Sequence, residues 1–395
     1  MHAAGFRGEG MHIAVLDAGF PGVNVIPAFQ PLFQQNRLLS TFDVVRGGTS
    51  VYDIDSHGTW VLSTMAAYQP NAFIGTAPNA SYHLIRTEDN RGTESPVEEA
   101  YWLIGAEYAD SVGVDIINSS LGYRDFDNPD FSYSYSQMDG NTALSTRAAD
   151  LASAVGILVV NSAGNSGNNA AWPYVSAPAD GDSVLSVGAV DSLGVRIGFS
   201  SVGPTADGQI KPNLATQGSQ TAIIDPSGFI GRGSGTSFAS PVLAGMAAGF
   251  WQANPTLTAQ QVRQYLELSG SQASAPDNLL GYGIPDFRRA YNLANPNSPL
   301  GLPVGEGRSV LELYPNPVPG AAFALRLPAR LINQLLTVRI TDAVGRTVSE
   351  QQLKTPSGSD SVTITAGENV LKSGLYLCQV RAASGEQHTL RFVRN

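Results

Sequence analysis

Cysteine is almost absent from this chain of 395 residues, which contains Cys378 and no second thiol to pair with it. An internal disulfide is therefore excluded, and packing, with or without bound ions, must hold the fold together. No stretch approaches the roughly 18 uncharged apolar residues of a membrane-spanning helix. The N-terminus also lacks a basic segment followed by an apolar run. We expect that any export signal has been removed or was never part of this chain.

Basic residues are also scarce, with 23 Lys and Arg against 33 Asp and Glu and a formal charge of −10. Residues 311–395 carry 9 basic and 6 acidic side chains, which leaves 14 and 27 for residues 1–310. No stripe of Lys and Arg is available to neutralise phosphates, and the aromatic spacing of a nucleic-acid module is missing. We therefore expect no nucleic-acid partner.

Short apolar runs alternate with helical patterns over the first part of the chain. The runs are Met11–Leu16, Tyr82–Ile85, Asp115–Asn118, Gly156–Val160 and Val184–Val190, and the clearest helical patterns are Val97–Ser111 and Asn141–Val155. Strands that alternate with helices are joined by crossovers, which produces a mostly parallel sheet with helices on both faces. The sequence therefore predicts an α/β fold.

A segment rich in small residues follows Ser237 and predicts a helix buried in the middle of this domain, opened by Ser237. Pro241 fits such a helix only near its first turn. A second helix is predicted at about Thr258–Ser269, and one more after the turn that ends at Asp286.

Composition changes near residue 295, where Pro, Gly and polar residues appear without periodicity. We interpret residues 295–310 as a linker between a domain at 1–294 and a second domain at 311–395. Short alternating runs separated by Gly and Asp turns predict that the second domain is a small all-β sandwich. These runs are Phe323–Leu327, Leu336–Thr341, Ser361–Ile364 and Leu375–Arg381.

Three residues in separate segments could supply a nucleophile, a base and an orienting carboxylate. Asp17 ends the first apolar run, His57 lies in Asp-Ser-His-Gly-Thr, and Ser237 lies in Gly-Thr-Ser-Phe-Ala-Ser-Pro. A serine hydroxyl attacks efficiently when a neutral imidazole accepts its proton, and a buried carboxylate fixes the tautomer of that imidazole. Each residue alone has a structural alternative, such as a helix cap for the serine.

These segments, in this order, resemble the three signatures of subtilisin-like peptidases. Two further segments, Ile116–Gly122 and Ser162–Gly167, are similar to the substrate-binding strand and the oxyanion loop of that family. The resemblance covers about residues 10–290. It implies a subtilisin-like fold and a triad of Asp17, His57 and Ser237.

The same resemblance implies roles for the residues around the triad. Asn165 would donate a hydrogen bond to the oxyanion. The substrate cleft would be lined by Ser120, Leu121, Gly122, Ser162, Ala163 and Gly164. One departure is Ala18, where the family usually has Ser or Thr, so we expect the carboxylate of Asp17 to lack one local hydrogen bond.

No cofactor is expected to be required for catalysis, and no metal ligand is assigned. The polar stretch Tyr123–Gly140 contains Asp125, Asp127, Asp130 and Asp139. It could form a rim that shapes substrate access, a calcium site that stabilises the fold, or a solvated loop. The spacing differs from that of an EF-hand loop, which disfavours calcium of that type.

The tail has a resemblance of its own, carried by Leu313–Val318, Ile340–Arg346, Ser373–Leu377 and the basic end Arg391–Arg394. This order is similar to the C-terminal sorting domain of type IX secretion cargo, with an accessory carbohydrate- or surface-binding sandwich as the alternative. It implies that residues 311–395 engage the type IX machinery and that the protein is secreted or held at the cell surface. The start of the chain resembles a mature subtilisin-like domain, so we expect a signal peptide and propeptide to be missing from it.

The sequence as a whole predicts a secreted serine endopeptidase that hydrolyses polypeptides through an acyl-enzyme. The rival hypothesis is a catalytically silent surface adhesin or binding protein built on the same fold. A binding protein needs neither the triad nor Asn165, which favours the enzyme.

Overall fold

The computed structural model describes residues 1–90, 92–300, 311–328, 331–332, 334–355, 361–366, 371–383 and 385–394. The chain forms two structural units, Met1–Pro299 and Leu300–Asn395. Residues 301–310, which make up most of the predicted linker, lie outside the described residues.

A seven-stranded sheet forms the centre of the first unit, and all neighbouring strands in it are parallel. In spatial order the strands are β2 (Leu38–Asp43), β5 (Ser81–Arg86), β1 (His12–Asp17), β6 (Ile116–Ser119), β7 (Leu158–Ser162), β8 (Leu185–Val190) and β9 (Leu214–Gln217). The five interior strands are buried along nearly their whole length, as expected when helices cover both faces of a sheet. The predicted α/β class is confirmed.

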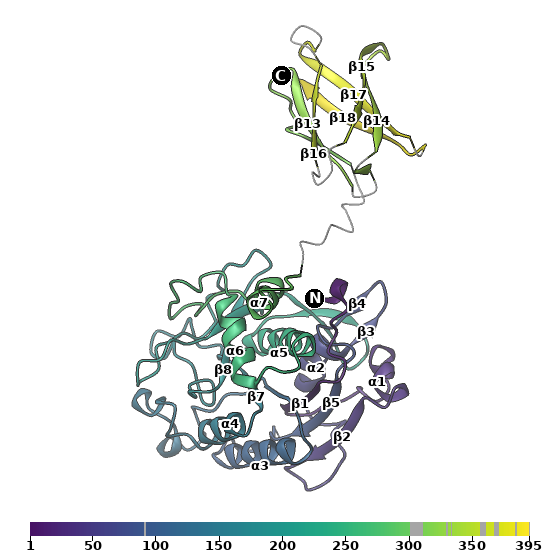
Figure 1. Ribbon diagram of the computed structural model, residues 1–395. Coiled ribbons are helices and arrows are strands. Elements are labelled where there is room, and N and C mark those ends of the chain that lie inside the picture. Colours follow the sequence, from purple (N-terminus) through teal and green to yellow (C-terminus); the bar gives the residue numbers. More distant parts are fainter. Residues whose placement is uncertain are drawn as a thin grey trace. The chain divides into compact units, whose positions relative to one another are not determined.

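Alternate residues of β1 pack against different helices, which shows that helices cover both faces. Ile13 and Val15 join a core with α2 (His57–Ala66) and α5 (Thr236–Ala253). Ala14 and Leu16 join the opposite core with α3 (Val97–Ser111) and α4 (Leu144–Ala154). The helices α6 (Ala259–Leu268) and α7 (Phe287–Ala294) pack on the same face of the sheet as α5. Figure 1 shows α3 and α4 side by side on the opposite face.

Several short elements complete the first unit. They are the helix α1 (Gln30–Gln34), the strand pairs β3 (Tyr68–Gln69) with β4 (Phe73–Ile74) and β10 (Thr221–Ile224) with β11 (Ile230–Gly233), and the 3₁₀ turns His2–Ala4, Pro27–Phe29, Pro129–Phe131 and Tyr135–Gln137.

Two helix starts differ from the sequence prediction. The helix expected from Asn141 begins at Leu144, because the carboxylate of Asp139 accepts hydrogen bonds from the backbone N–H groups of Asn141 and Thr142 and holds them in a turn. The helix expected to open at Ser237 begins at Thr236. Pro241 is therefore the sixth residue of α5, beyond the first turn.

The second unit consists of two antiparallel sheets. One has the order β12 (Glu312–Tyr314), β13 (Ala322–Arg326) and β16 (Ser361–Thr365), and the other β15 (Thr347–Lys354), β14 (Leu335–Asp342), β17 (Gly374–Ala382) and β18 (Gln387–Arg394). Side chains of both sheets share one core that contains Phe323, Val338 and the buried thiol of Cys378. The predicted all-β tail is confirmed.

The topology brings several strand ends to one edge of the parallel sheet. β1, β6 and β7 are neighbours, so Asp17, Ser119 and Ser162 end adjacent strands that point the same way. The helix α5 packs across β6 and β7. In open parallel sheets this carboxyl edge is where ligands bind.

Candidate active site

Asp17 is the last residue of β1, and its side chain is fully buried. Its Oδ1 atom accepts hydrogen bonds from the backbone N–H of Ala18 at 2.8 Å and from Nδ1 of His57 at 2.8 Å. Its Oδ2 atom is buried and has no hydrogen-bond partner among the described residues. Ala18, which has no hydroxyl, thus contributes a backbone donor and leaves the second oxygen unpaired.

His57 is the first residue of α2, and its backbone N–H donates to Oδ1 of Asp55 at 2.7 Å. The next residue is a glycine for a steric reason: a Cβ atom at Gly58 would collide with the carbonyl oxygen of Gly19, in the loop that follows β1. Close packing of these two segments brings the imidazole to the end of β1. The hydrogen bond to Asp17 then fixes which ring nitrogen carries the proton, so Nε2 is the unprotonated nitrogen of the neutral ring.

The surroundings of His57 raise its pKa. Burial by itself lowers the pKa, but the charge of Asp17, the hydrogen bond to Asp17 and the charge of Asp55 outweigh burial and hold it above the ordinary value of 6.5. All three favour the imidazolium form. This is the form that a base reaches after it has accepted a proton.

Ser237 is the second residue of α5 and is half-buried. Its hydroxyl donates a long hydrogen bond of 3.4 Å to the backbone carbonyl of Ser120. Among the described residues no hydrogen bond joins it to His57, but the imidazole packs beside the adjacent Phe238, with ring centroids 6.3 Å apart. The start of a helix also presents free N–H groups and the positive end of its dipole, which favour a developing negative charge.

Asn165 follows β7 and is oriented by a residue that the sequence analysis did not single out. Its Oδ1 atom accepts hydrogen bonds from the backbone N–H of Thr236 at 2.9 Å and from the Thr236 hydroxyl at 3.0 Å. Because the oxygen is occupied, the amide N–H groups are left to donate elsewhere. Thr236 also accepts from the backbone N–H of Gly164, at 3.1 Å. The position of Thr236 directly before Ser237 was the one feature of the sequence that could have pointed to this role.

A cavity of about 450 Å³ lies at this edge of the sheet and contains both Ser237 and Asn165. Five of the six predicted cleft residues line it, namely Ser120, Leu121, Gly122, Ser162 and Gly164. Ala163 does not, because its side chain is buried in a small apolar cluster with Val175 and Ala179.

Further residues line the cavity that the sequence analysis did not assign to it. They are Glu94, Arg124, Asp125, Ser166, Trp172 and Ser176. Arg124 and Asp125 belong to the stretch for which a substrate rim was one interpretation. The guanidinium of Arg124 lies 3.9 Å from the ring centre of Trp172 and pairs with Asp125 at 2.6 Å. All six come from loops, where residue spacing gives no periodic signal.

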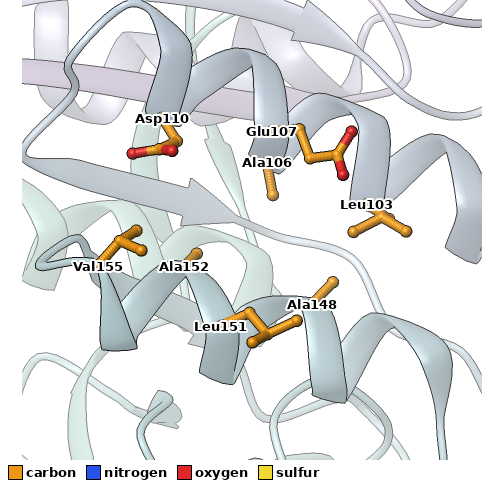
Figure 2. A pocket seen from close by; sticks show the side chains of 8 residues that line it. All are labelled: Leu103, Ala106, Glu107, Asp110, Ala148, Leu151, Ala152 and Val155. Carbon is orange, nitrogen blue, oxygen red and sulfur yellow. The ribbon is translucent and has the colours of Figure 1, made fainter.

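A second, smaller hollow of about 140 Å³ lies between α3 and α4, on the other face of the sheet from α5. Figure 2 shows that its walls are mainly apolar, with Leu103 on α3, Leu151 on α4 and Val155 directly after α4, and that Glu107 and Asp110 stand at its edge. It contains none of the predicted site residues.

No group of three or more His, Cys, Asp or Glu side chains that could hold a metal ion occurs among the described residues. In the stretch that suggested calcium, three of the four aspartate side chains make local contacts. Asp125 pairs with Arg124, Asp127 accepts from the backbone of Glu94, and Asp139 holds the turn before α4.

Comparisons with known proteins identify the first unit. Residues 8–283 match the Subtilase family. Subtilisin NAT of Bacillus subtilis subsp. natto is 35% identical over 290 residues, covering 72% of this chain and 65% of that protein. Subtilisin of Bacillus pumilus is 34% identical over 274 residues, covering 68% of this chain and 86% of that protein. This chain thus spans about two thirds of the length of several of its subtilisin relatives.

Solved structures show the same fold. The patellamide maturation protease PatA superposes with a TM-score of 0.57 at 25% identity, covering 73% of this chain and 98% of that chain. The prenylagaramide maturation protease PagA gives a TM-score of 0.55 at 22% identity, covering 71% of this chain and 91% of that chain.

Residues 312–394 match a Secretion system C-terminal sorting domain. A domain of this kind indicates that the protein is secreted or held at the cell surface. None of the helices in the described parts of the chain is long and apolar enough to span a membrane. With the match over residues 8–283 and the subtilisin relatives, the chain belongs to the subtilase family.

Proposed function

We propose that this protein is a serine endopeptidase that hydrolyses polypeptides through an acyl-enzyme at Ser237, and that residues 311–395 direct its export. One observation carries the first part: the carboxylate of Asp17 holds Nδ1 of His57 at 2.8 Å, at the edge of the sheet where Ser237 and Asn165 share a cavity. A nucleophile, a base, an orienting carboxylate and an oxyanion donor are the four groups that acyl transfer needs.

In the first step the hydroxyl of Ser237 attacks the carbonyl carbon of the substrate, and Nε2 of His57 takes its proton. The resting hydrogen bond from Ser237 to the Ser120 carbonyl is 3.4 Å, so little free energy opposes the rotation of the hydroxyl toward His57. Asp17 stabilises the resulting imidazolium and holds the ring in place.

Negative charge then develops on the former carbonyl oxygen. The amide of Asn165 and the backbone N–H of Ser237 are the donors proposed to receive it, and Thr236 holds the amide in the required orientation. Donors that are fixed before the reaction need no reorganisation as the charge appears. His57 next returns its proton to the leaving amine, and water repeats the sequence on the ester to release the second product.

A fluorophosphonate probe tests the proposal directly, because it reacts with serines that are activated in this way. We expect the purified protein to be labelled at one residue, identified as Ser237 by mass spectrometry of the peptides, and to hydrolyse casein. A silent adhesin or binding protein would do neither. Labelling at a different serine would overturn the assignment of Ser237.

The pH dependence of activity should respond to Asp55. Its carboxylate raises the pKa of His57, and the base must be neutral, so activity falls as pH drops through that pKa. Asp55→Asn removes one negative charge, which should lower the pKa of His57 and move the acid limb of kcat/KM to lower pH.

The matched control is Asp53→Asn, which removes a half-buried carboxylate that pairs with Arg46 at 2.7 Å. Profiles of kcat/KM on both sides of the His57 pKa should show a displaced acid limb in the Asp55 variant alone. An unmoved limb, or one displaced to higher pH, would show that the charge of Asp55 does not act on the base.

The charge in the cavity favours substrates with a basic side chain. Arg124 is paired with Asp125, whereas no cation is paired with Glu94 among the described residues. Burial, together with the negative charges of Glu98 and Asp127, raises the pKa of Glu94 to about 7. A substrate lysine or arginine at this position would relieve the repulsion between these carboxylates.

We therefore expect a peptide whose side chain in the cavity is lysine to be cleaved faster than the same peptide with norleucine there. Norleucine has the same four-carbon chain as lysine and no charge. The ratio of their kcat/KM values should rise roughly fivefold as Glu94 ionises, the effect of about 1 kcal/mol for an ion pair that stays open to solvent. Both substrates use the same His57, so its titration cancels in the ratio.

Glu94→Gln should remove this pH dependence, whereas Glu107→Gln, in the separate hollow of Figure 2, should retain it. A ratio that is flat in the unmodified protein, or equally steep in the Glu94 variant, would contradict a role for Glu94 in selecting substrates.

For the tail we propose type IX secretion as the route, with the peptidase in residues 1–294, a linker at 295–310 and the sorting domain at 311–395. The two structural units and the two family matches support this division. Residues 311–395 fused to a fluorescent protein that is exported to the periplasm should reach the surface of a host with type IX secretion, and remain inside when that system is deleted. Retention in both hosts would mean that the tail is an accessory module.

A further inference from the structure

Pro241 removes a backbone hydrogen bond from α5 close to the proposed nucleophile. In an α-helix each N–H donates to the carbonyl four residues earlier, and proline has no N–H. Pro241 lies inside α5, four residues after Ser237. The carbonyl of Ser237 therefore lacks its regular helical donor.

The side chain of Ser120 supplies a donor to this carbonyl. Its hydroxyl lies 2.8 Å from the carbonyl oxygen of Ser237, and Ser120 is 6% exposed. The contact is reciprocal, because the Ser237 hydroxyl donates to the Ser120 carbonyl. Two hydrogen bonds thus join Ser120, which follows β6, to Ser237, the proposed nucleophile.

Neighbouring groups orient the Ser120 hydroxyl. It accepts a weak hydrogen bond of 3.5 Å from Nδ2 of Asn118, whose Oδ1 accepts from the hydroxyl of Ser240 at 2.9 Å. Asn118 and Ser240 are fully buried. A polar chain of four residues therefore links β6 to the first two turns of α5, at the point where the helix is short of a donor.

We propose that Ser120 is a positioning residue for catalysis, whose hydroxyl replaces the hydrogen bond that Pro241 cannot make and holds the main chain of Ser237 in place. This inference rests on the proposed function. Ser237 would provide both the attacking oxygen and one oxyanion N–H, so a shift of its main chain displaces two reacting groups at once. The role is additional to lining the substrate cavity.

A double-mutant cycle tests the inference. Ser120→Ala removes the hydroxyl, and we expect kcat to fall roughly tenfold, the effect of about one buried hydrogen bond, with KM changed less than kcat. Pro241→Ala restores an N–H that can donate to Ser237, so Ser120→Ala/Pro241→Ala should regain most of the lost kcat. Pro241→Ala alone should change kcat little, and Ser120→Thr, which keeps a hydroxyl, should retain most of the activity.

Rescue by a substitution in a different segment is the decisive readout, because a general loss of packing at Ser120 would not be repaired at Pro241. If Ser120→Ala does not fold, as judged by thermal unfolding, the same cycle is run with Ser120→Cys, whose thiol is a weak donor. Full kcat in the Ser120 variant, or no recovery in the double variant, would overturn the role of Ser120. An unmodified protein that neither reacts with the fluorophosphonate nor cleaves casein would instead overturn the proposed function itself.

Discussion

Ser237→Ala should lower kcat by about 10⁶-fold, which is the size of the effect known for removal of the nucleophile in subtilisin itself. Without the hydroxyl no acyl-enzyme forms, and His57 has no proton to transfer. The residual rate should still exceed that of the reaction in water, because Asn165 and the cavity remain. Turnover of a chromogenic peptide over days, with active-site titration of the unmodified protein, measures the ratio.

The same substitution should leave folding almost unchanged. Among the described residues the Ser237 hydroxyl makes a single hydrogen bond, of 3.4 Å, so its removal should alter the free energy of unfolding by no more than about 0.5 kcal/mol. Ser227→Ala, in the turn between β10 and β11, is a control for serine replacement and should keep full activity.

The losses of kcat caused by substituting the triad residues should not be additive in free energy. His57→Ala combined with Ser237→Ala should be no slower than either single variant, because each step needs both groups. Independent, multiplying losses would show that the two residues do not act as one unit.

Much of the fold can be predicted from local sequence because its interior strands are buried on both faces. The apolar runs that predict β1, β5 and β8 coincide with strands to within a residue or two, and α3 has the predicted bounds Val97–Ser111. The edge strand β2 has no such run, since Ser40 and Thr41 interrupt its apolar character where the strand is partly exposed. The other edge strand, β9, also lacks such a run, since its two apolar residues are followed by Thr216 and Gln217.

The boundaries that differ from prediction depend on side-chain hydrogen bonds. The predicted start of α4 is three residues early because Asn141 and Thr142 fit a helical pattern, whereas Asp139 captures their N–H groups in a turn. An aspartate side chain and the helical backbone compete to bind the same N–H groups. A pattern of apolar residues does not show which of the two binds them.

The candidate site divides in the same way. Asp17, His57, Asn165 and Ser237 lie in short motifs with a specific order, so the sequence is enough to propose roles for them. Contacts that join one motif to another cannot be predicted in this way, even where the sequence singles out one of the residues, as it does for Ser120. The contact of Thr236 with Asn165 spans 71 residues, and that of Ser120 with Ser237 spans 117. Ala163 was predicted to line the cleft because it lies in a motif, but its side chain is buried away from the cavity. A motif does not show which of its side chains face the cavity.

Asn165→Gly should reduce kcat by roughly 10² to 10³, or about 2.7 to 4 kcal/mol, the known effect of removing this donor from subtilisin. KM should change by no more than a few-fold, because the amide acts mainly on charge that appears in the transition state.

In this protein Asn165→Gly removes both the amide N–H proposed to donate to the oxyanion and the oxygen that accepts two hydrogen bonds from Thr236. Asn165→Asp separates them, because an aspartate keeps an acceptor for Thr236 but has no N–H to offer the oxyanion. We expect Asn165→Asp to lose at least as much kcat as Asn165→Gly, since its negative charge also opposes the charge of the intermediate. If Asn165→Asp instead retained most of the activity while Asn165→Gly lost it, Asn165 would act by anchoring Thr236 at the start of α5. The oxyanion would then depend on the backbone N–H of Ser237 and on other donors in the cavity.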